Sequence, residues 1–253
     1  MDLGLRDRLV LITGAGGGTG PTIAKAFAAE GAIVALHQRR PYPQSRVQAA
    51  ASEIVASGGR AFAVAAELRS PEETTTMVER LVAEHGPVGV LVTATSAYRN
   101  DRFPEIDEDT WAMVTDAMLG ATYRVARAVV PGMQSAGWGR IVNISARSGL
   151  AGVARAVHYA AAKAGIVGLT AALAKELGPS GILVNAVAPT KILTYLDGQP
   201  SIPPDKAAAM AKAIPLRRIA TADDLASVVL WLGSAANTYV TGELVSLTGG
   251  AQT

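Results

Sequence analysis

This chain of 253 residues is 49% hydrophobic and 17% charged, a balance that excludes intrinsic disorder, which needs low hydrophobicity and high net charge. The net charge is only +2, and the Lys and Arg residues are scattered among acidic ones, so nucleic acid is not an expected partner. The sequence contains no cysteine, which excludes disulfides, thiol nucleophiles and cysteine-ligated metals, and we expect no metal site.

Short β-branched runs alternate with helix-length segments rich in Ala, Leu, Glu and Lys along the whole chain. The predicted strands are residues 9–13, 33–37, 61–65, 88–93, 140–145, 183–188 and 244–247. The predicted helices between them are residues 22–30, 46–57, 71–85, 110–136, 160–177 and 222–233. Because parallel strands need crossover connections, the pattern predicts a Rossmann-like, doubly wound α/β fold: a parallel sheet of seven strands with helices on both faces.

No linker rich in Pro, Gly and Ser divides the chain, so residues 1–253 are expected to form a single domain. The segment 192–205, which contains three prolines, interrupts the alternation and predicts a substrate lid at about residues 190–215. No apolar run approaches the roughly 18 residues of a membrane span, and the first run, residues 9–12, is shorter than a signal-peptide core. We therefore expect a cytoplasmic protein with no membrane partner.

A glycine-rich turn joins the first predicted strand to the first predicted helix. Residues 13–20 read Thr-Gly-Ala-Gly-Gly-Gly-Thr-Gly, which fits T-G-x-x-x-G-x-G but not G-x-G-x-x-G. Glycines allow a dinucleotide to approach the backbone, and the helix N-terminus favours its pyrophosphate. The alternative is a turn that is merely tight. The predicted phosphate contacts are Gly14, Gly16, Gly17, Gly18, Thr19 and Gly20.

The end of the second predicted strand indicates which dinucleotide binds. An acidic residue here would bind the ribose hydroxyls of NAD, but residues 37–40 read His-Gln-Arg-Arg. Arg39 and Arg40 can grip a 2′-phosphate, so NADP(H) is the preferred cofactor and NAD(H) stays possible. The alternative is that both arginines are solvated surface charges.

Tyr159 and Lys163 lie four residues apart at the start of a predicted helix, which places both side chains on one face. Ser145 ends the fifth predicted strand. Further motifs are Trp-Gly-Arg-Ile-Val-Asn-Ile-Ser at residues 138–145, Val-Asn-Ala-Val-Ala-Pro at 184–189 and Val-Thr-Gly at 240–242. With the glycine turn, these motifs make nearly the whole chain resemble the short-chain dehydrogenase/reductase family, and its 3-oxoacyl-ACP-reductase-like members in particular.

The resemblance implies a role for each matching residue. Tyr159 would exchange a proton with the substrate oxygen, while Lys163 would lower the pKa of Tyr159 and hold the nicotinamide ribose. Further cofactor contacts would be Glu67, Thr93, Lys163, Pro189, Thr190 and Ile192. The substrate pocket would contain Thr95, Tyr98, Ala146, Arg147, Val153 and Tyr159. The family commonly forms tetramers, so we expect a homo-oligomer, a dimer or tetramer, that binds a small-molecule substrate.

The sequence departs from the family's pattern where catalysis depends on it. The usual catalytic serine aligns with Ala146, and the usual asparagine of the proton relay aligns with Met118. Losing a hydrogen-bond donor to the reacting oxygen costs about 3 kcal/mol, or about a hundredfold in rate. Ser145, which we take as the third catalytic residue, Ser148 and Thr190 are possible substitutes.

Three functions stay open on this evidence. The preferred one is an NADP(H)-dependent oxidoreductase that transfers hydride to or from a carbonyl or imine of a small, apolar substrate. The second is a non-redox catalyst on the same scaffold, such as a cyclase, a dehydratase or a rearrangement catalyst. The third is a catalytically silent binding subunit.

Overall fold

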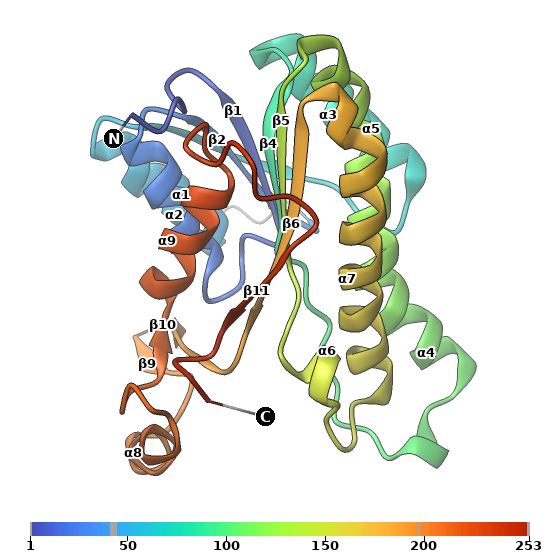
Figure 1. Ribbon diagram of the computed structural model, residues 1–253, viewed down its shortest axis with the longest axis vertical. Coiled ribbons are helices and arrows are strands. Elements are labelled where there is room, and N and C mark those ends of the chain that lie inside the picture. The colour runs from blue at the N-terminus through green and yellow to red at the C-terminus, as the bar shows by residue number, and fades with distance from the viewer. Residues whose placement is uncertain (1, 41–44, 197, 252–253) are drawn as a thin grey trace.

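A parallel sheet between two layers of helices forms the centre of the computed structural model, which describes residues 2–40, 45–196 and 198–251 (Figure 1). Its seven strands follow the order β11-β6-β5-β4-β1-β2-β3, and each neighbouring pair is parallel. These strands are β1 (Leu9–Thr13), β2 (Ile33–Gln38), β3 (Arg60–Ala65), β4 (Val88–Thr93), β5 (Gly139–Ile144), β6 (Ile182–Pro189) and β11 (Leu244–Leu247). The predicted fold class is therefore confirmed.

The helices divide between the two faces of the sheet, as Figure 1 shows. One face carries α1 (Gly20–Ala29), α2 (Arg46–Ala56) and α9 (Ala222–Leu232). The other carries α3 (Pro71–His85), α5 (Ala121–Ala136) and α7 (Val157–Leu177). By length and composition the stretch Val157–Ser180 could also cross a membrane, but in this fold it packs along β6.

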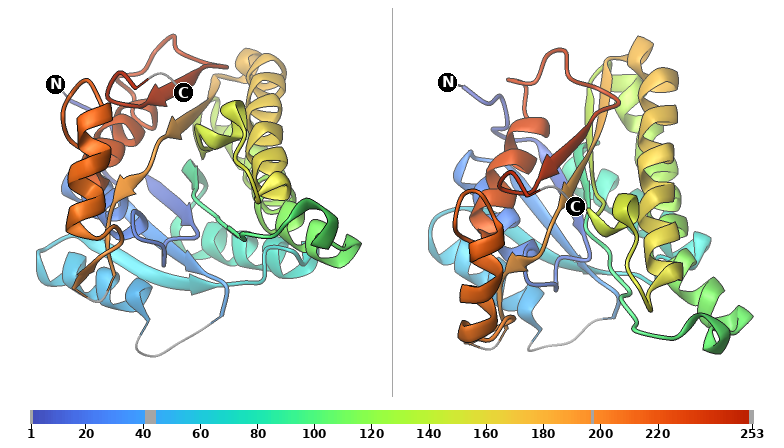
Figure 2. Two further views of the ribbon diagram at one scale, coloured as in Figure 1. Left: turned by 90° about the horizontal axis from the view of Figure 1, so that it is seen from below. Right: turned by 60° about the horizontal axis from the view of Figure 1, so that its bottom comes forward.

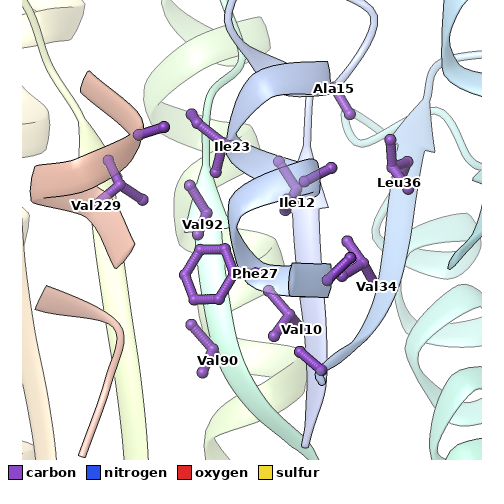
Figure 3. Close-up of a cluster of buried hydrophobic side chains, with 14 of the residues drawn as sticks. Val10, Ile12, Ala15, Ile23, Phe27, Val34, Leu36, Val90, Val92 and Val229 are labelled. Atoms are coloured by element: carbon purple, nitrogen blue, oxygen red, sulfur yellow. The ribbon is translucent and has the colours of Figure 1, made fainter. Parts of the chain in front are cut away.

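Apolar side chains of α1 pack against the strands to make one of the two large cores. Ile23 and Phe27, both fully buried, lie over Val10, Ile12 and Val92 (Figure 3). The strands contribute side chains to both faces, which explains why each reads as a continuous apolar run rather than an alternating one. This packing fixes the position of the turn between β1 and α1.

The predicted helix 110–136 is wrong in one respect, because two helices and a π-helical turn occupy this span. They are α4 (Glu108–Thr115), η2 (Asp116–Gly120) and α5. The Asp116 carboxylate lies over Gly120, where a Cβ would overlap it, and accepts a hydrogen bond of 2.6 Å from Arg124. A side chain at position 120 would therefore displace the Asp116 carboxylate from its place beside Arg124.

The predicted lid is not a plain loop. It contains the two-residue strands β7 (Ile192–Leu193), β8 (Tyr195–Leu196) and β9 (Gln199–Pro200), followed by α8 (Pro204–Ala213). A proline suits the first position of a helix because its missing N–H would be unpaired there anyway, so α8 begins at Pro204. β7 also pairs with β10 (Ala220–Thr221). Seen from the carboxyl ends of the strands, α8 and α4 lie on opposite sides of the molecule (Figure 2).

A buried arginine fastens the chain near the amino ends of the strands. The guanidinium of Arg140, in β5, donates hydrogen bonds to the carbonyl oxygens of Ser234 (3.1 Å) and Asn237 (3.0 Å). It also lies 4.6 Å from the ring centre of Trp138, over which Arg8 lies at 3.6 Å. Burial lowers the pKa of Arg140 to about 10, so the side chain stays charged at neutral pH.

Candidate active site

The glycine turn lies at the carboxyl ends of β1 and β4, where the strand order reverses and where α/β sheets bind their ligands. Gly14 has a φ of +66°, and a Cβ there would come 2.7 Å from the carbonyl oxygen of Ala94. At Gly20 a Cβ would overlap the backbone of Ala15. Both positions therefore require glycine, which keeps the turn narrow and its backbone open to a ligand.

The lid lies directly on this turn through Thr194, a residue that the sequence analysis missed. A Cβ on Gly18 would lie 2.6 Å from Oγ1 of Thr194. Thr194 is held by two hydrogen bonds with Ser201. The Thr194 amide donates to Oγ of Ser201 at 3.0 Å, and the Ser201 amide donates to the Thr194 carbonyl oxygen at 2.7 Å. Nothing in the sequence around Thr194 indicates this contact, because it depends on the path that the lid takes after Pro189.

A cavity of about 490 Å³ opens beside the turn. Its wall includes Gly14, Gly17, His37, Arg39, Glu67 and Thr95. Burial raises the pKa of Glu67, but hydrogen bonds from Arg69 and the charges of Arg69 and Arg39 outweigh it, so the pKa lies below its ordinary value. Both arginines are exposed, but Arg39 lies near this carboxylate on the wall, whereas Arg40 is outside the described lining.

His37 links the turn to the next strand end, and the sequence analysis assigned it no role. Its Nδ1 accepts from the Gly14 amide at 3.3 Å, and its Nε2 lies 2.9 Å from the Ala66 carbonyl oxygen. These partners require a neutral ring with the proton on Nε2. Burial lowers the pKa of His37, although the bond to Ala66 and the charge of Glu67 oppose the shift. The ring therefore stays neutral and holds Gly14.

Tyr159 and Lys163 lie on one face of α7, as their spacing predicted. The Lys163 ammonium is buried and donates to the carbonyl oxygens of Thr95 (3.1 Å) and Ile144 (2.8 Å), while its Nζ lies 5.9 Å from the centre of the Tyr159 ring. Burial lowers the pKa of Lys163 to about 8. The lysine therefore touches the segment after β4 and the end of β5.

The expected acidification of Tyr159 by Lys163 is not met in this structure. Burial, and then the charge of the neighbouring Tyr98 phenol, raise the pKa of Tyr159, against hydrogen bonds with the hydroxyls of Ser148 and Ser96. The two tyrosine rings meet edge to face with centres 5.2 Å apart. The phenol consequently keeps its proton at neutral pH.

The structure does not support Ser145 as a catalytic residue. Its hydroxyl is buried and donates to the Lys163 carbonyl oxygen at 2.7 Å, because the residue after β5 turns its side chain toward α7. The hydroxyls that reach Tyr159 belong to Ser148, which was one of the possible substitutes, and to Ser96. Met118 is fully buried in a small cluster with Ala162, against which Tyr159 packs.

Thr93, an expected cofactor contact, ends β4 with its side chain turned into the core. Its hydroxyl, almost fully buried, donates to Oδ1 of Asn143 at 2.8 Å, and Nδ2 of Asn143 donates to Thr170 at 2.9 Å. The Thr93 side chain is therefore part of the core between β4, β5 and α7, and a contact of its backbone with the cofactor stays a prediction. Of the other expected cofactor contacts, Pro189 ends β6, Thr190 follows it and Ile192 begins β7.

A second cavity, of about 560 Å³, lies in front of the Tyr159 phenol. Five of the six residues predicted for the substrate pocket form its wall: Tyr98, Ala146, Arg147, Val153 and Tyr159. The sixth, Thr95, lines the first cavity. The additional lining residues are Ser148, Ala151, Gly152, Pro189, Thr190 and Lys191. The described wall is mostly apolar and carries two cations, Arg147 and Lys191, but no carboxylate. A molecule bound there would therefore meet mainly apolar surface.

Comparison with known proteins gives a consistent result. The model of the short chain dehydrogenase family matches residues 8–201. Nodulation protein G of Azospirillum brasilense is 34% identical over 246 residues, which cover 97% of this chain and 98% of that protein. The 3-oxoacyl-[acyl-carrier-protein] reductase FabG of Pseudomonas aeruginosa is 34% identical over 248 residues, or 98% of both chains.

A relative with a different substrate in its name is equally similar. The probable galactose dehydrogenase GalD of Rhizobium meliloti is 35% identical over 249 residues, which cover 97% of this chain and 95% of that protein. Similarity at this level spans different substrates, so it identifies the scaffold and the reaction type rather than the compound that reacts. From the match to the family model, the full-length similarity to these relatives and the parallel sheet with its glycine turn, we conclude that the chain belongs to the short-chain dehydrogenase family of oxidoreductases.

Proposed function

We propose that this protein is an NADPH-dependent reductase of carbonyl or imine groups. The main support is the meeting of two cavities at one pair of side chains. Tyr159 lines the larger cavity, and Lys163, one helical turn further, donates to the carbonyl of Thr95, which lines the other. A nicotinamide in the first cavity and a carbonyl in the second would both be within reach of this pair.

The cofactor fits the residues that are present. The turn at Gly14 and Gly20 admits no side chain and begins a helix, as a pyrophosphate requires, and the cavity beside it has a cationic residue, Arg39, on its wall. NADPH would supply the hydride. The protein would supply orientation and a proton.

In our proposal Tyr159 is the proton donor. The phenol is protonated at neutral pH, as any tyrosine near its ordinary pKa is, and it can give this proton to a developing alkoxide in the direction of reduction. Burial raises its pKa and so makes it a weaker acid than an exposed tyrosine. Ser148 and Ser96 would orient the phenol in place of the serine that Ala146 replaces. Lys163, held by two carbonyl oxygens, would bind the nicotinamide ribose.

The activity test follows NADPH absorbance with a panel of ketones, imines and β-keto thioesters, each with and without a carboxylate. We expect consumption of NADPH, fastest for apolar substrates with a negative end, and a loss of about a hundredfold or more in Tyr159→Phe. Turnover that survives in this variant would refute the role of Tyr159. Conversion of a substrate without NADPH consumption would instead support a non-redox catalyst.

We propose NADP(H) rather than NAD(H) because Arg39 lines the cofactor cavity. Arg39→Ala should weaken NADPH binding about tenfold, the value of one charge-assisted hydrogen bond, and leave NADH binding unchanged. Arg40→Ala is the matched control, since Arg40 lies outside the described lining. Fluorescence titration of both nucleotides measures this, and equal losses for NADPH and NADH in Arg39→Ala would contradict the preference.

We further propose a homo-oligomer in the cytoplasm that takes small-molecule substrates. Two aromatic side chains on neighbouring helices support association, since Trp111 of α4 is 38% exposed and Tyr123 of α5 is 50% exposed. Exposed aromatic side chains are typical of protein interfaces. Light scattering that gives the mass of one chain would contradict this proposal.

A further inference from the structure

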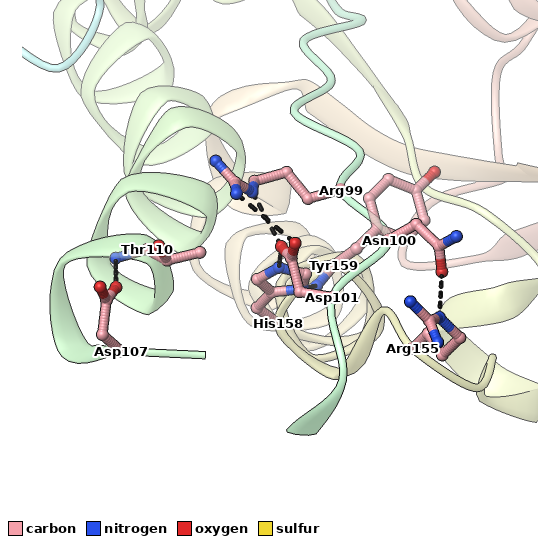
Figure 4. Close-up of polar contacts among 8 residues, drawn as sticks. All are labelled: Arg99, Asn100, Asp101, Asp107, Thr110, Arg155, His158 and Tyr159. Atoms are coloured by element: carbon pink, nitrogen blue, oxygen red, sulfur yellow. Dashed lines mark hydrogen bonds and ion pairs between the residues drawn. The ribbon is translucent and has the colours of Figure 1, made fainter. Parts of the chain in front are cut away.

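A fully buried histidine precedes Tyr159. Nδ1 of His158 accepts from the Tyr159 amide at 2.9 Å, and its Nε2 lies 3.3 Å from Oδ2 of Asp101 (Figure 4). Because Nδ1 accepts, the proton of the neutral ring is on Nε2, which therefore donates to Asp101. The imidazole thus bridges the backbone of Tyr159 to a carboxylate from a distant part of the chain.

Asp101 is itself held from several sides. Arg99 donates to Oδ2 at 2.8 Å, and the Asp101 amide donates to the Arg155 carbonyl oxygen at 2.8 Å. Nε of Arg155 donates to Oδ1 of Asn100 at 3.0 Å. The hydrogen bond from Arg99 lowers the pKa of Asp101, so the carboxylate is charged at neutral pH. Residues 99–101 are therefore fixed against the start of α7.

The segment between β4 and Asp101 makes three contacts with the Tyr159–Lys163 pair. The carbonyl of Thr95 accepts from Lys163, the hydroxyl of Ser96 is hydrogen-bonded to the phenol, and the ring of Tyr98 packs edge-on against that of Tyr159. The upstream end of this segment is held at Ala94, whose amide donates to the Thr13 carbonyl oxygen at 3.1 Å. The downstream end is held by the Asp101 carboxylate through His158, beside the two hydrogen bonds with Arg155.

We propose that Asp101 and His158 are positioning residues that hold the segment 95–98 against Tyr159. This inference rests on the proposed function, since it assigns them an effect on the proton donor of that reaction. Without the pair, Tyr98 and Ser96 lose their fixed place beside the phenol. The orientation of the phenol then becomes loose, and proton transfer slows.

A matched control exists in the same part of the molecule. Oδ1 of Asp107 accepts from the Thr110 amide at 2.7 Å and caps α4, and Asp107 has no direct contact with Tyr159 among the described residues (Figure 4). An effect that only reflects the loss of a negative charge from this part of the molecule should be the same for Asp101 and Asp107.

The first experiment needs no substrate. The full-length protein is labelled with ¹³C at the ζ carbon of tyrosine, and the signals of Tyr98 and Tyr159 are assigned with phenylalanine variants. We expect Asp101→Ala to move both signals and Asp107→Ala to move neither. In Asp101→Asn both signals should return most of the way to their wild-type positions, because the amide oxygen of the asparagine still accepts from His158. In His158→Asn the asparagine side chain is too short to reach Asp101, so this variant should move the same two signals as Asp101→Ala. It replaces Asp101→Ala in the experiment if that variant does not fold.

The second experiment measures kinetics with NADPH. We expect Asp101→Ala to lower kcat about tenfold with an unchanged KM for NADPH, a misplacement effect rather than a loss of binding. Unmoved tyrosine signals in both Asp101→Ala and His158→Asn would overturn the proposal, as would equal effects of Asp107→Ala. If the wild-type protein turns over no substrate, the proposed function fails, and the NMR result still decides the positioning role.

Discussion

Lys163 should lower the stability of the protein at neutral pH, and the size of this effect can be worked out from its burial. The ammonium is buried, and its pKa falls from 10.5 to about 8. One pKa unit corresponds to about 1.4 kcal/mol, so keeping this charge in the folded state costs about 3 kcal/mol. The two hydrogen bonds to carbonyl oxygens favour the charged form, which makes this figure an upper limit.

The sign of the pH dependence follows from proton binding. Between about pH 8 and pH 10.5 the unfolded chain holds the lysine proton and the folded chain has released it, so stability rises with pH. Between about pH 7 and pH 9.5 the free energy of unfolding of the wild type should gain about 2 kcal/mol relative to that of Lys163→Met, which lacks the titrating group.

Urea unfolding followed by tryptophan fluorescence measures this difference at each pH. Lys175→Met is the matched control, because Lys175 is an exposed lysine in the last turn of the same helix and should show no such gain. A difference between wild type and Lys163→Met that stays constant with pH would refute the reasoning. The same variant should lose NADPH-dependent turnover.

Further expectations concern the core and the glycine turn, and urea unfolding tests each of them. Asn143→Ala leaves the hydroxyl of Thr93 without its partner and should cost about 2 kcal/mol. Thr122→Val should instead stabilise the protein by about 1 kcal/mol, because the Thr122 hydroxyl is buried without a hydrogen-bond partner among the described residues; a loss would show that an undetected partner exists. Gly20→Ala should cost about 3 kcal/mol through overlap with backbone, whereas Gly17→Ala, with open contact distances, should leave stability unchanged; equal losses would contradict this.

The strands could be predicted because each is an apolar run of strand length bounded by polar residues or glycine. The predicted bounds of β1, β4 and β11 agree with the structure, and the other four differ by one residue at most at either end. The break in the helix 110–136 could not be predicted from periodicity, because the apolar pattern continues through the π-helical turn, where Asp116 contacts Gly120 and Arg124.

The catalytic pair could be predicted from its spacing, but the direction of single hydroxyls could not. Ser145 and Ser148 lie three residues apart, yet one donates to the backbone of α7 and the other reaches the phenol, since the turn after β5 separates them. His158 gave no signal in the sequence because its partner Asp101 lies 57 residues away. Pairs of this kind depend on the packing of the segment after β4 against α7.

The attachment of Arg140 determines how the protein should respond to acid. Its partners are peptide oxygens, which have no proton to gain at moderate acidity, so the link from β5 to Ser234 and Asn237 is preserved when carboxylates are neutralised. The surface pair of Arg218 with Asp224 behaves differently, since hydrogen bonds from Arg218 lower the pKa of Asp224 and this contribution disappears once that group is protonated. Acid should therefore weaken the start of α9 and leave the Arg140 link at the amino end of β5 in place.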